Sequence, residues 1–485
     1  AGGRAPRDAA GSRVDAERLL MRVPFLGRMF GGGRKRASLD YTAVGKGRRA
    51  TSWLASGAGP NAALIGSLAV LRDRSRDAAR KNAYAAAAVE QIVSNVVGTG
   101  IKPQSLAFDE AFRKAAHALW WDWTDEADAD GRLDFYGLEA LCIRSVATAG
   151  EVFVRLRPRR PQDGLIVPFQ LQVLEAEHCP AEKNELAPNG NVIRAGSEFD
   201  AIGRRVAYWL YPQHPAEGVL QVGTAGMLPV RVPADDVLHL YWPLRPGQIR
   251  GEPWLVRALV KMRELEAYDD AELTRKKAAA MFVGFVTRPD PEGAFMGEGE
   301  ADADGAAEAA LEPGTMRFLA PGEEIRFSEP ADVGGSYEAF MRQQARLIAT
   351  AIGILYEELT GDYSQLNDRT LRAALIAVRR RYAMWQHHLL AFQLCRPVWR
   401  RWLDSAVMAG ALERPPGMAD RDFYRAKWIP QPWPYLHPVQ GVEAQVKEIR
   451  AGLATRSEKV SERGYDAEQL DREMAGDNAR ADGLG

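Results

Sequence analysis

Few side chains in this sequence have the types and spacing that metal binding or catalysis requires. The acidic run Asp125–Gly131 is the first candidate, because alternating carboxylates around a glycine are typical of calcium-binding loops. With Gly131 in the sixth position of such a loop, the twelfth position holds Gly137, where a bidentate glutamate is needed. We therefore interpret the run as a solvated loop that caps a helix over Phe135–Ala149.

The histidines do not form a catalytic or metal-binding set. His239 lies on a predicted strand near Asp235 and Asp236, and a lone histidine beside carboxylates is usually a hydrogen-bonded structural residue. His387 and His388 are adjacent, so on a helix they point about 100° apart and do not readily share a metal ion. The common motifs of nucleotide binding, serine hydrolysis and zinc binding do not occur. The sequence predicts no catalytic residue, cofactor or metal ligand, and favours a binding or structural role.

Composition indicates a soluble globular protein of several regions. The chain has 485 residues, 46% hydrophobic and 26% charged, with a formal net charge of −1, so any nucleic-acid signal must be local. Its three cysteines, Cys142, Cys179 and Cys395, are scattered, which fits a reducing compartment and predicts neither a disulfide nor a zinc framework. No apolar run approaches the roughly 18 residues of a membrane span. We expect a cytoplasmic origin and no membrane partner.

The stretch Ser336–Val407 has the pattern helix, short polar loop, longer helix. Apolar residues recur at helical spacing from Phe340 to Leu355, and the loop TGDYSQLND collects residues that favour turns and helix caps. Asn367 and Asp368 precede the returning helix and can cap it. Between positions 369 and 403 there is no acidic residue, but there are eight arginines: Arg369, Arg372, Arg379, Arg380, Arg381, Arg396, Arg400 and Arg401. Such a helix is expected to face a polyanion or an acidic neighbour.

An α+β body is predicted before this stretch. Residues 1–50 hold twelve basic and four acidic side chains and form a basic arm, either a disordered tail or a segment that contacts nucleic acid or an acidic partner. Helical patterns follow at 61–98, 107–124 and 135–149, and the second contains three tryptophans that we place in a core or a subunit contact. Strands are predicted at 151–157, 169–174, 190–193, 206–211 and 237–241.

The body is followed by an outward excursion and a helical C-terminal part. A long helix is predicted from Pro253 to about Val283. Residues 289–316 then hold eight acidic and no basic residues with five glycines, so they are expected to be flexible or ordered by a partner. Short strands are predicted at 316–319 and 325–327 before the helix at 336. After an extended aromatic stretch at 428–435, helices are predicted at 438–454 and 467–475.

Several long runs resemble one known family. They are RDAARKNAYAAAAVEQIVSNVVGTGIKPQ (76–104), GEVFVRLRPRR (150–160), LQVLEAEHC (171–179), ADDVLHLYWPLRPGQIRGEPWL (234–255), RKKAAAMFVGFVTR (275–288) and LTGDYSQLNDRT (359–370). In this order they resemble the portal proteins of lambda-type tailed bacteriophages, over roughly residues 60–475. The resemblance implies an α+β portal-type fold and a ring, probably of 12 subunits, at one capsid vertex of the virion.

The resemblance also implies a division of the chain. Its regions would be the basic arm (1–50), the α+β wing (51–250), a stem helix (251–287), the clip (288–335), the returning stem helix (336–355), the tunnel loop (356–369), a wing continuation with the basic helix (370–437) and the crown (438–485). Double-stranded DNA would pass through the channel during packaging and ejection. Further partners would be the terminase large subunit, the head–tail adaptor, the major capsid protein and the scaffold, with assembly in the host cytoplasm.

Three groups of residues are the expected contact sites. The DNA-facing tunnel loop would present Gly361, Asp362, Tyr363, Ser364, Gln365, Asn367 and Arg369. The channel side of the stem would present Lys276 and Lys277. The clip would dock its partners through Asp290, Glu292, Glu298, Glu300, Asp302 and Asp304.

A channel that moves DNA must not hold phosphates tightly, because each neutralised phosphate adds salt-dependent affinity. A loop with one arginine fits that requirement. For the arginines of the basic helix we prefer pairing with acidic residues of the body or of the next subunit, and direct DNA contact is the alternative. Two other functions remain as competing hypotheses: a DNA-processing enzyme with an unrecognised site, and a membrane pore.

Overall fold

The computed structural model describes residues 56–217, 228–280, 284–287, 324–327, 337–433 and 437–483. Residues 58–485 form one unit, and all that follows concerns its described residues. At its centre lies a three-stranded antiparallel sheet in the order β3 (Phe169–Leu174), β2 (Glu151–Pro158), β9 (Val237–Tyr241). Phe153 of β2 pairs with Leu174 on one side and His239 on the other. Val152, Phe153 and Val154 are all buried, so both faces of β2 are covered.

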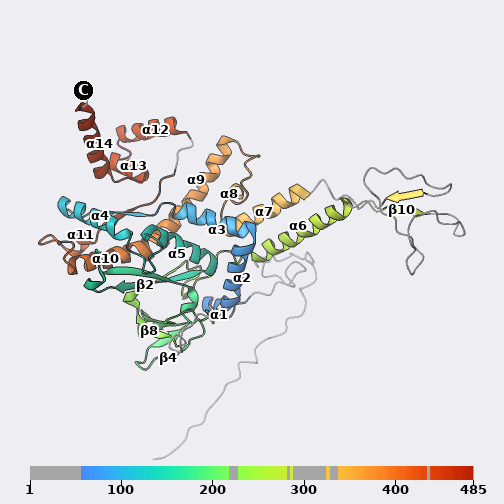
Figure 1. Cartoon of the computed structure of the whole chain (residues 1–485), viewed down its shortest axis with the longest axis horizontal. Helices are drawn as coiled ribbons and strands as arrows, with labels where there is room; N and C mark the ends of the chain where they lie inside the picture. The colour runs from blue at the N-terminus through green and yellow to red at the C-terminus, as the bar shows by residue number, and fades with distance from the viewer. Residues whose placement is uncertain are drawn as a thin grey trace, which may run out of the picture. The chain divides into compact units, whose positions relative to one another are not determined.

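Helices pack against one side of this sheet, and further strands lie on its other side (Figure 1). The predicted helical pattern at 61–98 is three helices, because Gly66 ends the first and Asn82 caps the third through its side-chain oxygen. They are α1 (Pro60–Ile65), α2 (Leu68–Lys81) and α3 (Ala83–Val96), followed by α4 (Glu110–Thr124) and α5 (Phe135–Ala149). The acidic run before α5 is only partly solvated, because Asp128 is buried and its carboxylate accepts three backbone N–H bonds. The cap of α5 is Asp134, which lies beyond the run predicted to cap this helix.

Tryptophans fill the core between α4 and α10 (Arg396–Met408). Trp120 lies with its ring centroid 5.2 Å from Trp399 and 5.0 Å from Trp402. Trp123 is fully buried and donates its indole N–H to the carbonyl of Phe169 at 2.8 Å. Their neighbour Trp121 is 60% exposed. The predicted tryptophan cluster therefore divides between the core and the surface.

A buried ion cluster joins α2 to the sheet. Glu151 of β2 accepts hydrogen bonds from Arg72, from Arg250 at 2.7 Å and from the amide of Gly251 at 2.7 Å. It also lies 2.9 Å from Nε2 of His239, so this histidine is structural, as predicted, but its carboxylate partner is Glu151 rather than Asp235 or Asp236. The two guanidinium groups hold the pKa of Glu151 well below its usual value despite burial.

A second sheet of five antiparallel strands follows the chain order from β4 to β8. Its strands are β4 (Glu185–Leu186), β5 (Val192–Arg194), β6 (Ser197–Phe199), β7 (Arg205–Leu210) and β8 (Val230–Pro233). Glu198 of β6 accepts a bidentate pair of bonds from Arg231 at 2.8 and 3.0 Å. This hydrogen bonding lowers the pKa of Glu198 to about 2 and fixes β6 to the β8 edge of the sheet.

The excursion begins later than predicted. Residues 253–258 form turns, and the backbone N–H of Trp254 fixes them to α5 by donating to the carbonyl of Ala147. The helix α6 then runs from Leu259 to Ala280. The predicted start at Pro253 is therefore wrong. Strands β10 (Gly284–Thr287) and β11 (Glu324–Phe327) pair antiparallel, so the two chain segments that flank the acidic insert meet. The predicted strand at 316–319 lies outside the described residues.

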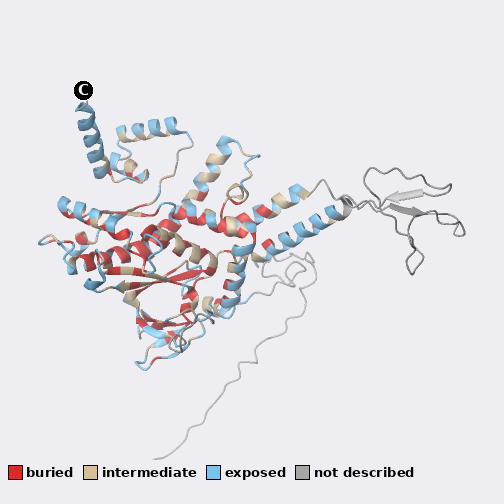
Figure 2. Cartoon of the chain, viewed as in Figure 1, coloured by how far each residue is buried: buried red, intermediate tan, exposed pale blue. Residues whose placement is uncertain are grey.

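The chain returns through α7 (Tyr337–Ile352), α8 (Tyr356–Thr360) and α9 (Asp368–Trp385), and continues as a π-helix (Gln386–Cys395) into α10. After α11 (Asp420–Phe423), β12 (Ala426–Ile429) pairs with β1 (Lys102–Ser105). The C-terminal helices are α12 (Pro438–Arg450), α13 (Arg456–Glu462) and α14 (Ala467–Asp482). Figure 2 shows buried residues concentrated around the sheet and α5, whereas α12 and α14 are mostly exposed.

Candidate functional site

The loop predicted to face DNA begins at a sharp corner after α7. Gly353 has a φ of +96°, a conformation that glycine adopts readily and other residues do not. A side chain here would also collide with the guanidinium of Arg381, which donates to the carbonyl of Gly353. Arg381 thus ties this corner to α9, and its guanidinium can come this close because Gly353 has no side chain.

Glu358 of α8 fixes the loop to two other helices. Its carboxylate accepts a bond from the hydroxyl of Tyr382 of α9 at 2.8 Å and from the side-chain amide of Asn95 of α3 at 3.4 Å. It also accepts from the amide of Leu355 at 3.0 Å, which caps the start of α8. One carboxylate therefore holds α3, α8 and α9 together at the base of the loop.

The loop itself satisfies its own polar groups. Gly361, with a φ of +69°, ends α8 and donates its N–H to Glu357 at 2.9 Å. Asp362 accepts bonds from the amide and hydroxyl of Ser364, at 3.1 and 2.6 Å, and from the hydroxyl of Tyr356 at 2.8 Å. These bonds, those from Ser364 first, lower the pKa of Asp362 to about 2. The carboxylate is therefore ionised at every physiological pH.

The tip of the loop presents small and polar groups to solvent. Ser364 and Gln365 are exposed, and Tyr363 is 53% exposed. Asn367 caps α9 by accepting from the amide of Thr370 at 2.9 Å, as its position predicted. Arg369 is exposed and has no ion pair among the described residues. The tip of the loop, from Gly361 to Asn367, thus carries one negative charge, that of Asp362, together with neutral donors and acceptors. Asp362 also lies 3.6 Å from Arg342 of α7, and Arg369 follows the tip as a cation without an ion pair among the described residues.

The two lysines predicted to line the stem are exposed at the C-terminal end of α6. Lys276 Nζ lies 4.8 Å from the ring centroid of Tyr337 on α7 and 3.9 Å from Glu272. Lys277 has no ion pair with any described residue. The six acidic clip residues, Asp290, Glu292, Glu298, Glu300, Asp302 and Asp304, lie outside the described residues.

The arginines of the basic helix find few carboxylates within their own chain. Arg372 pairs with Asp368 at 3.6 Å, and Arg401 pairs with Asp236 at 3.1 Å. The other contacts are with a carbonyl or with aromatic rings, as for Arg379, which lies 5.0 Å from the ring centroid of Trp433. Within the described residues, acidic partners from the body therefore account for only a minority of the arginines, and a contribution of the next subunit stays a prediction.

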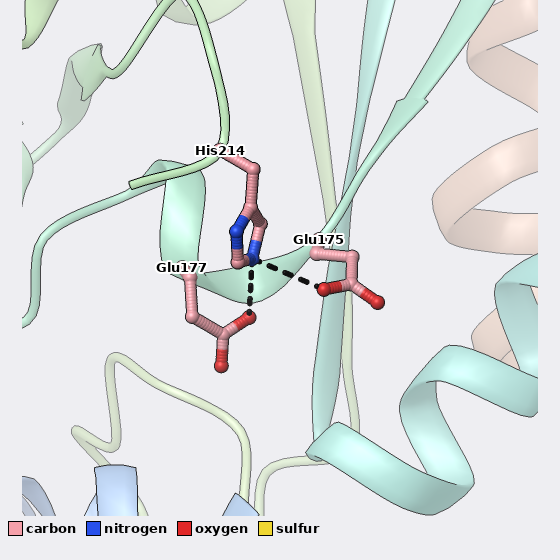
Figure 3. Close-up of side chains that lie close together, drawn as sticks. All are labelled: Glu175, Glu177 and His214. Atoms are coloured by element: carbon pink, nitrogen blue, oxygen red, sulfur yellow. Dashed lines mark ion pairs between the residues drawn. The ribbon is translucent and has the colours of Figure 1, made fainter. Parts of the chain in front are cut away.

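One cluster was not predicted from the sequence. Ligand atoms of Glu175, Glu177 and His214 lie within 4.8 Å of one another (Figure 3). His214 Nε2 is 3.2 Å from Glu175 and 3.9 Å from Glu177. The guanidinium of Arg76 already pairs with both carboxylates, at 3.4 and 2.8 Å, so the two negative charges have a cationic partner within the chain. We interpret the cluster as an ion-pair network that joins α2 to the region after β3.

Comparison with known proteins decides the family. The model of the family described as "Phage portal protein, lambda family" matches residues 46–386, more than half of the chain. The chain belongs to the lambda family of phage portal proteins. Curated relatives that the chain matches over most of its length are also portal proteins.

One relative, the probable portal protein of Halomonas phage phiHAP-1, is 28% identical over 433 residues, covering 86% of this chain and 81% of the relative. Portal protein B of Escherichia phage lambda is 22% identical, covering 88% of this chain and 86% of the relative. Among solved structures, a chain from the neck of an empty GTA particle is similar with a TM-score of 0.47 and 16% identity, covering 80% of this chain and 93% of that chain.

The family assignment settles the class of function. The chain is a portal protein of a phage or phage-like particle, with an α+β fold, and is a structural component rather than an enzyme. The hypothesis of a DNA-processing enzyme is therefore wrong. Portal membership supports oligomeric assembly in the capsid and a location at the capsid vertex. None of the described helices has the length and apolarity that crossing a membrane would need.

Proposed function

We propose that this chain forms a ring, of 12 subunits, whose channel passes double-stranded DNA, with the loop at 356–369 as the part that faces the DNA. The observation that carries this assignment is the internally satisfied loop: Asp362 is fixed by Ser364 and Tyr356, and the tip is exposed and polar. Such a loop needs no partner to hold its shape, so it can remain in contact with a moving polymer.

The charge of the loop suits sliding rather than binding. Lysine and arginine contacts with phosphates release counterions and give tight, salt-dependent affinity. Against one cation without a described ion pair, Arg369, the loop at 356–369 carries four carboxylates, those of Glu357, Glu358, Asp362 and Asp368. Each subunit would therefore touch the DNA through hydroxyl and amide groups that exchange readily with water. Lys276 and Lys277 would give a second, weak contact lower in the channel.

The remaining regions take the roles that the family suggests. The wing would be 51–250 with 370–437, the stem 251–287 with 336–355, and the crown 438–485. The pairing of β10 with β11 supports a clip at 288–335 that is closed at its base. Its acidic residues would dock the terminase large subunit and later the head–tail adaptor. The wing and crown would meet the major capsid protein and the scaffold during assembly in the host cytoplasm.

Deletion of Gly361–Gln365 tests the loop assignment. The deletion removes the exposed tip but leaves the anchors Glu358 and Tyr382, so rings should assemble normally in electron micrographs while DNA packaging or retention in particles falls strongly. A matched control is deletion of Gln162–Gly164, an exposed turn between β2 and β3, which should leave packaging unchanged. Normal packaging by the loop deletion would show that the loop does not face the DNA.

A further inference from the structure

One face of the long helix from α9 through the π-helix into α10 remains exposed. Every fourth residue from position 376 to position 400 lies on this face, and all seven are exposed: Ile376, Arg380, Met384, His388, Phe392, Arg396 and Arg400. We call them the α9–α10 stripe. Three are large apolar side chains, exposed by 49% for Ile376, 41% for Met384 and 60% for Phe392. Interleaved apolar and basic groups of this kind differ from single apolar residues scattered on a surface.

The π-helix keeps the stripe on one side. Four residues overshoot a full α-helical turn by about 40°, so a fourth-residue stripe slowly winds around an α-helix. In a π-helix, with its i→i+5 bonds, four residues fall short of a full turn. The stripe therefore winds back in the opposite direction along this segment. This π-helix is ten residues long, whereas most are single turns, which frequently lie at functional sites. Its opposite face is buried through Leu389, Leu390 and Leu394.

The cations of the stripe have no acidic partner among the described residues. Arg396 lies 5.9 Å from the ring centroid of Phe392, and Arg400 lies 5.8 Å from that of Tyr424. From Asp368 to Met408 there are eight arginines and two acidic residues, yet the whole chain has a formal charge of −1. The compensating carboxylates therefore lie elsewhere on the same chain, so a second copy is a source of acidic partners for the stripe.

We propose that the α9–α10 stripe is a subunit interface, covered in the assembled portal by the acidic and apolar surface of a second copy of this chain. Arginine, methionine and aromatic residues together are typical of the cores of protein interfaces. DNA would satisfy the arginines but would leave Ile376, Met384 and Phe392 without an apolar partner. The inference rests on the proposed ring and adds the surface that forms it.

Thiol labelling tests the interface with little perturbation. The three native cysteines are buried, so a cysteine introduced on the surface is the reactive one. In the full-length protein, F392C should react with a maleimide at least tenfold more slowly in rings than in dissociated monomers. The control I202C, at a position 80% exposed on the turn before β7, should react equally in both. Equal rates for F392C in rings and monomers would overturn the proposal.

Charge insertion provides the second test. The double variant M384E/F392E should remain folded, with an unchanged melting temperature of the monomer, but should fail to form rings by mass photometry and electron microscopy, whereas I202E should assemble like the wild type. Wild-type ring formation by M384E/F392E would overturn the interface. Intact rings that no longer package DNA would show that the stripe faces DNA, which also overturns it. A wild-type chain that never forms rings would instead contradict the proposed function.

Discussion

The carboxyl group of Glu139 on α5 is completely buried and has no cationic partner among the described residues. One of its oxygens accepts the amide of Ile101 at 2.8 Å, and the other accepts the thiol of Cys395 at 3.2 Å. Burial raises its pKa to about 8, so near neutral pH the group is protonated. It joins α5, the segment before β1 and the end of the π-helix as a neutral hydrogen-bonding residue.

This residue predicts a pH dependence of stability. Because the folded state binds the proton more tightly than the unfolded state, stability is full below about pH 4.5 and declines as the pH rises through about 8. Each unit of pKa difference corresponds to about 1.4 kcal/mol. The glutamine of E139Q keeps an oxygen that accepts the amide N–H of Ile101, but it does not titrate. The unfolding free energy of E139Q, measured with denaturant, should therefore fall less between pH 5 and pH 8.5 than that of the wild type. Equal declines in both proteins would exclude this titration.

At the scale of elements, predictions succeeded where the pattern was local. The strands expected at 169–174 and 237–241 are β3 and β9 within the same bounds, because each is a short run rich in apolar residues that follows a turn-favouring residue, Pro168 or Asp236. The pairing of β1 with β12 joins segments that are far apart in the chain, and neither has an alternating pattern. The π-helix has ordinary helical composition, so only its hydrogen bonds distinguish it.

The corner between α7 and α8 predicts the effect of one methyl group. G353A adds a side chain at a φ of +96°, where the conformation is strained and the new carbon would meet Arg381. We expect a loss of about 1–3 kcal/mol of stability, and faster hydrogen exchange in α8 and the loop that follows. The control G410A has a φ of +73° but open space around it, so it should show the backbone strain alone. A smaller effect of G353A than of G410A would contradict the role of Arg381.

At the scale of the whole molecule, the sequence predicted the chemistry of the loop better than the partners of the basic helix. Asn367 and Gly361 act as the cap and the turn that their residue types favour. Pairing of the arginines with acidic residues of the body was not a sufficient account, since Arg381 binds a carbonyl and Arg379 lies over an aromatic ring. These contacts form between segments that folding brings together, so they cannot be predicted by counting charges along the sequence.

A ring multiplies every charge in its channel, which gives the last prediction. If the loop faces DNA without gripping it, S364R/Q365R should convert the channel into a phosphate-binding ring. Each phosphate contact adds about 0.9 to the slope of log affinity against log salt, so the slope measured for purified rings and duplex DNA should steepen by several units, and packaging should slow. The control I202R/L186R adds the same two charges at exposed positions outside the loop and should change neither quantity. An unchanged salt slope for S364R/Q365R would mean that the loop tips do not reach the DNA.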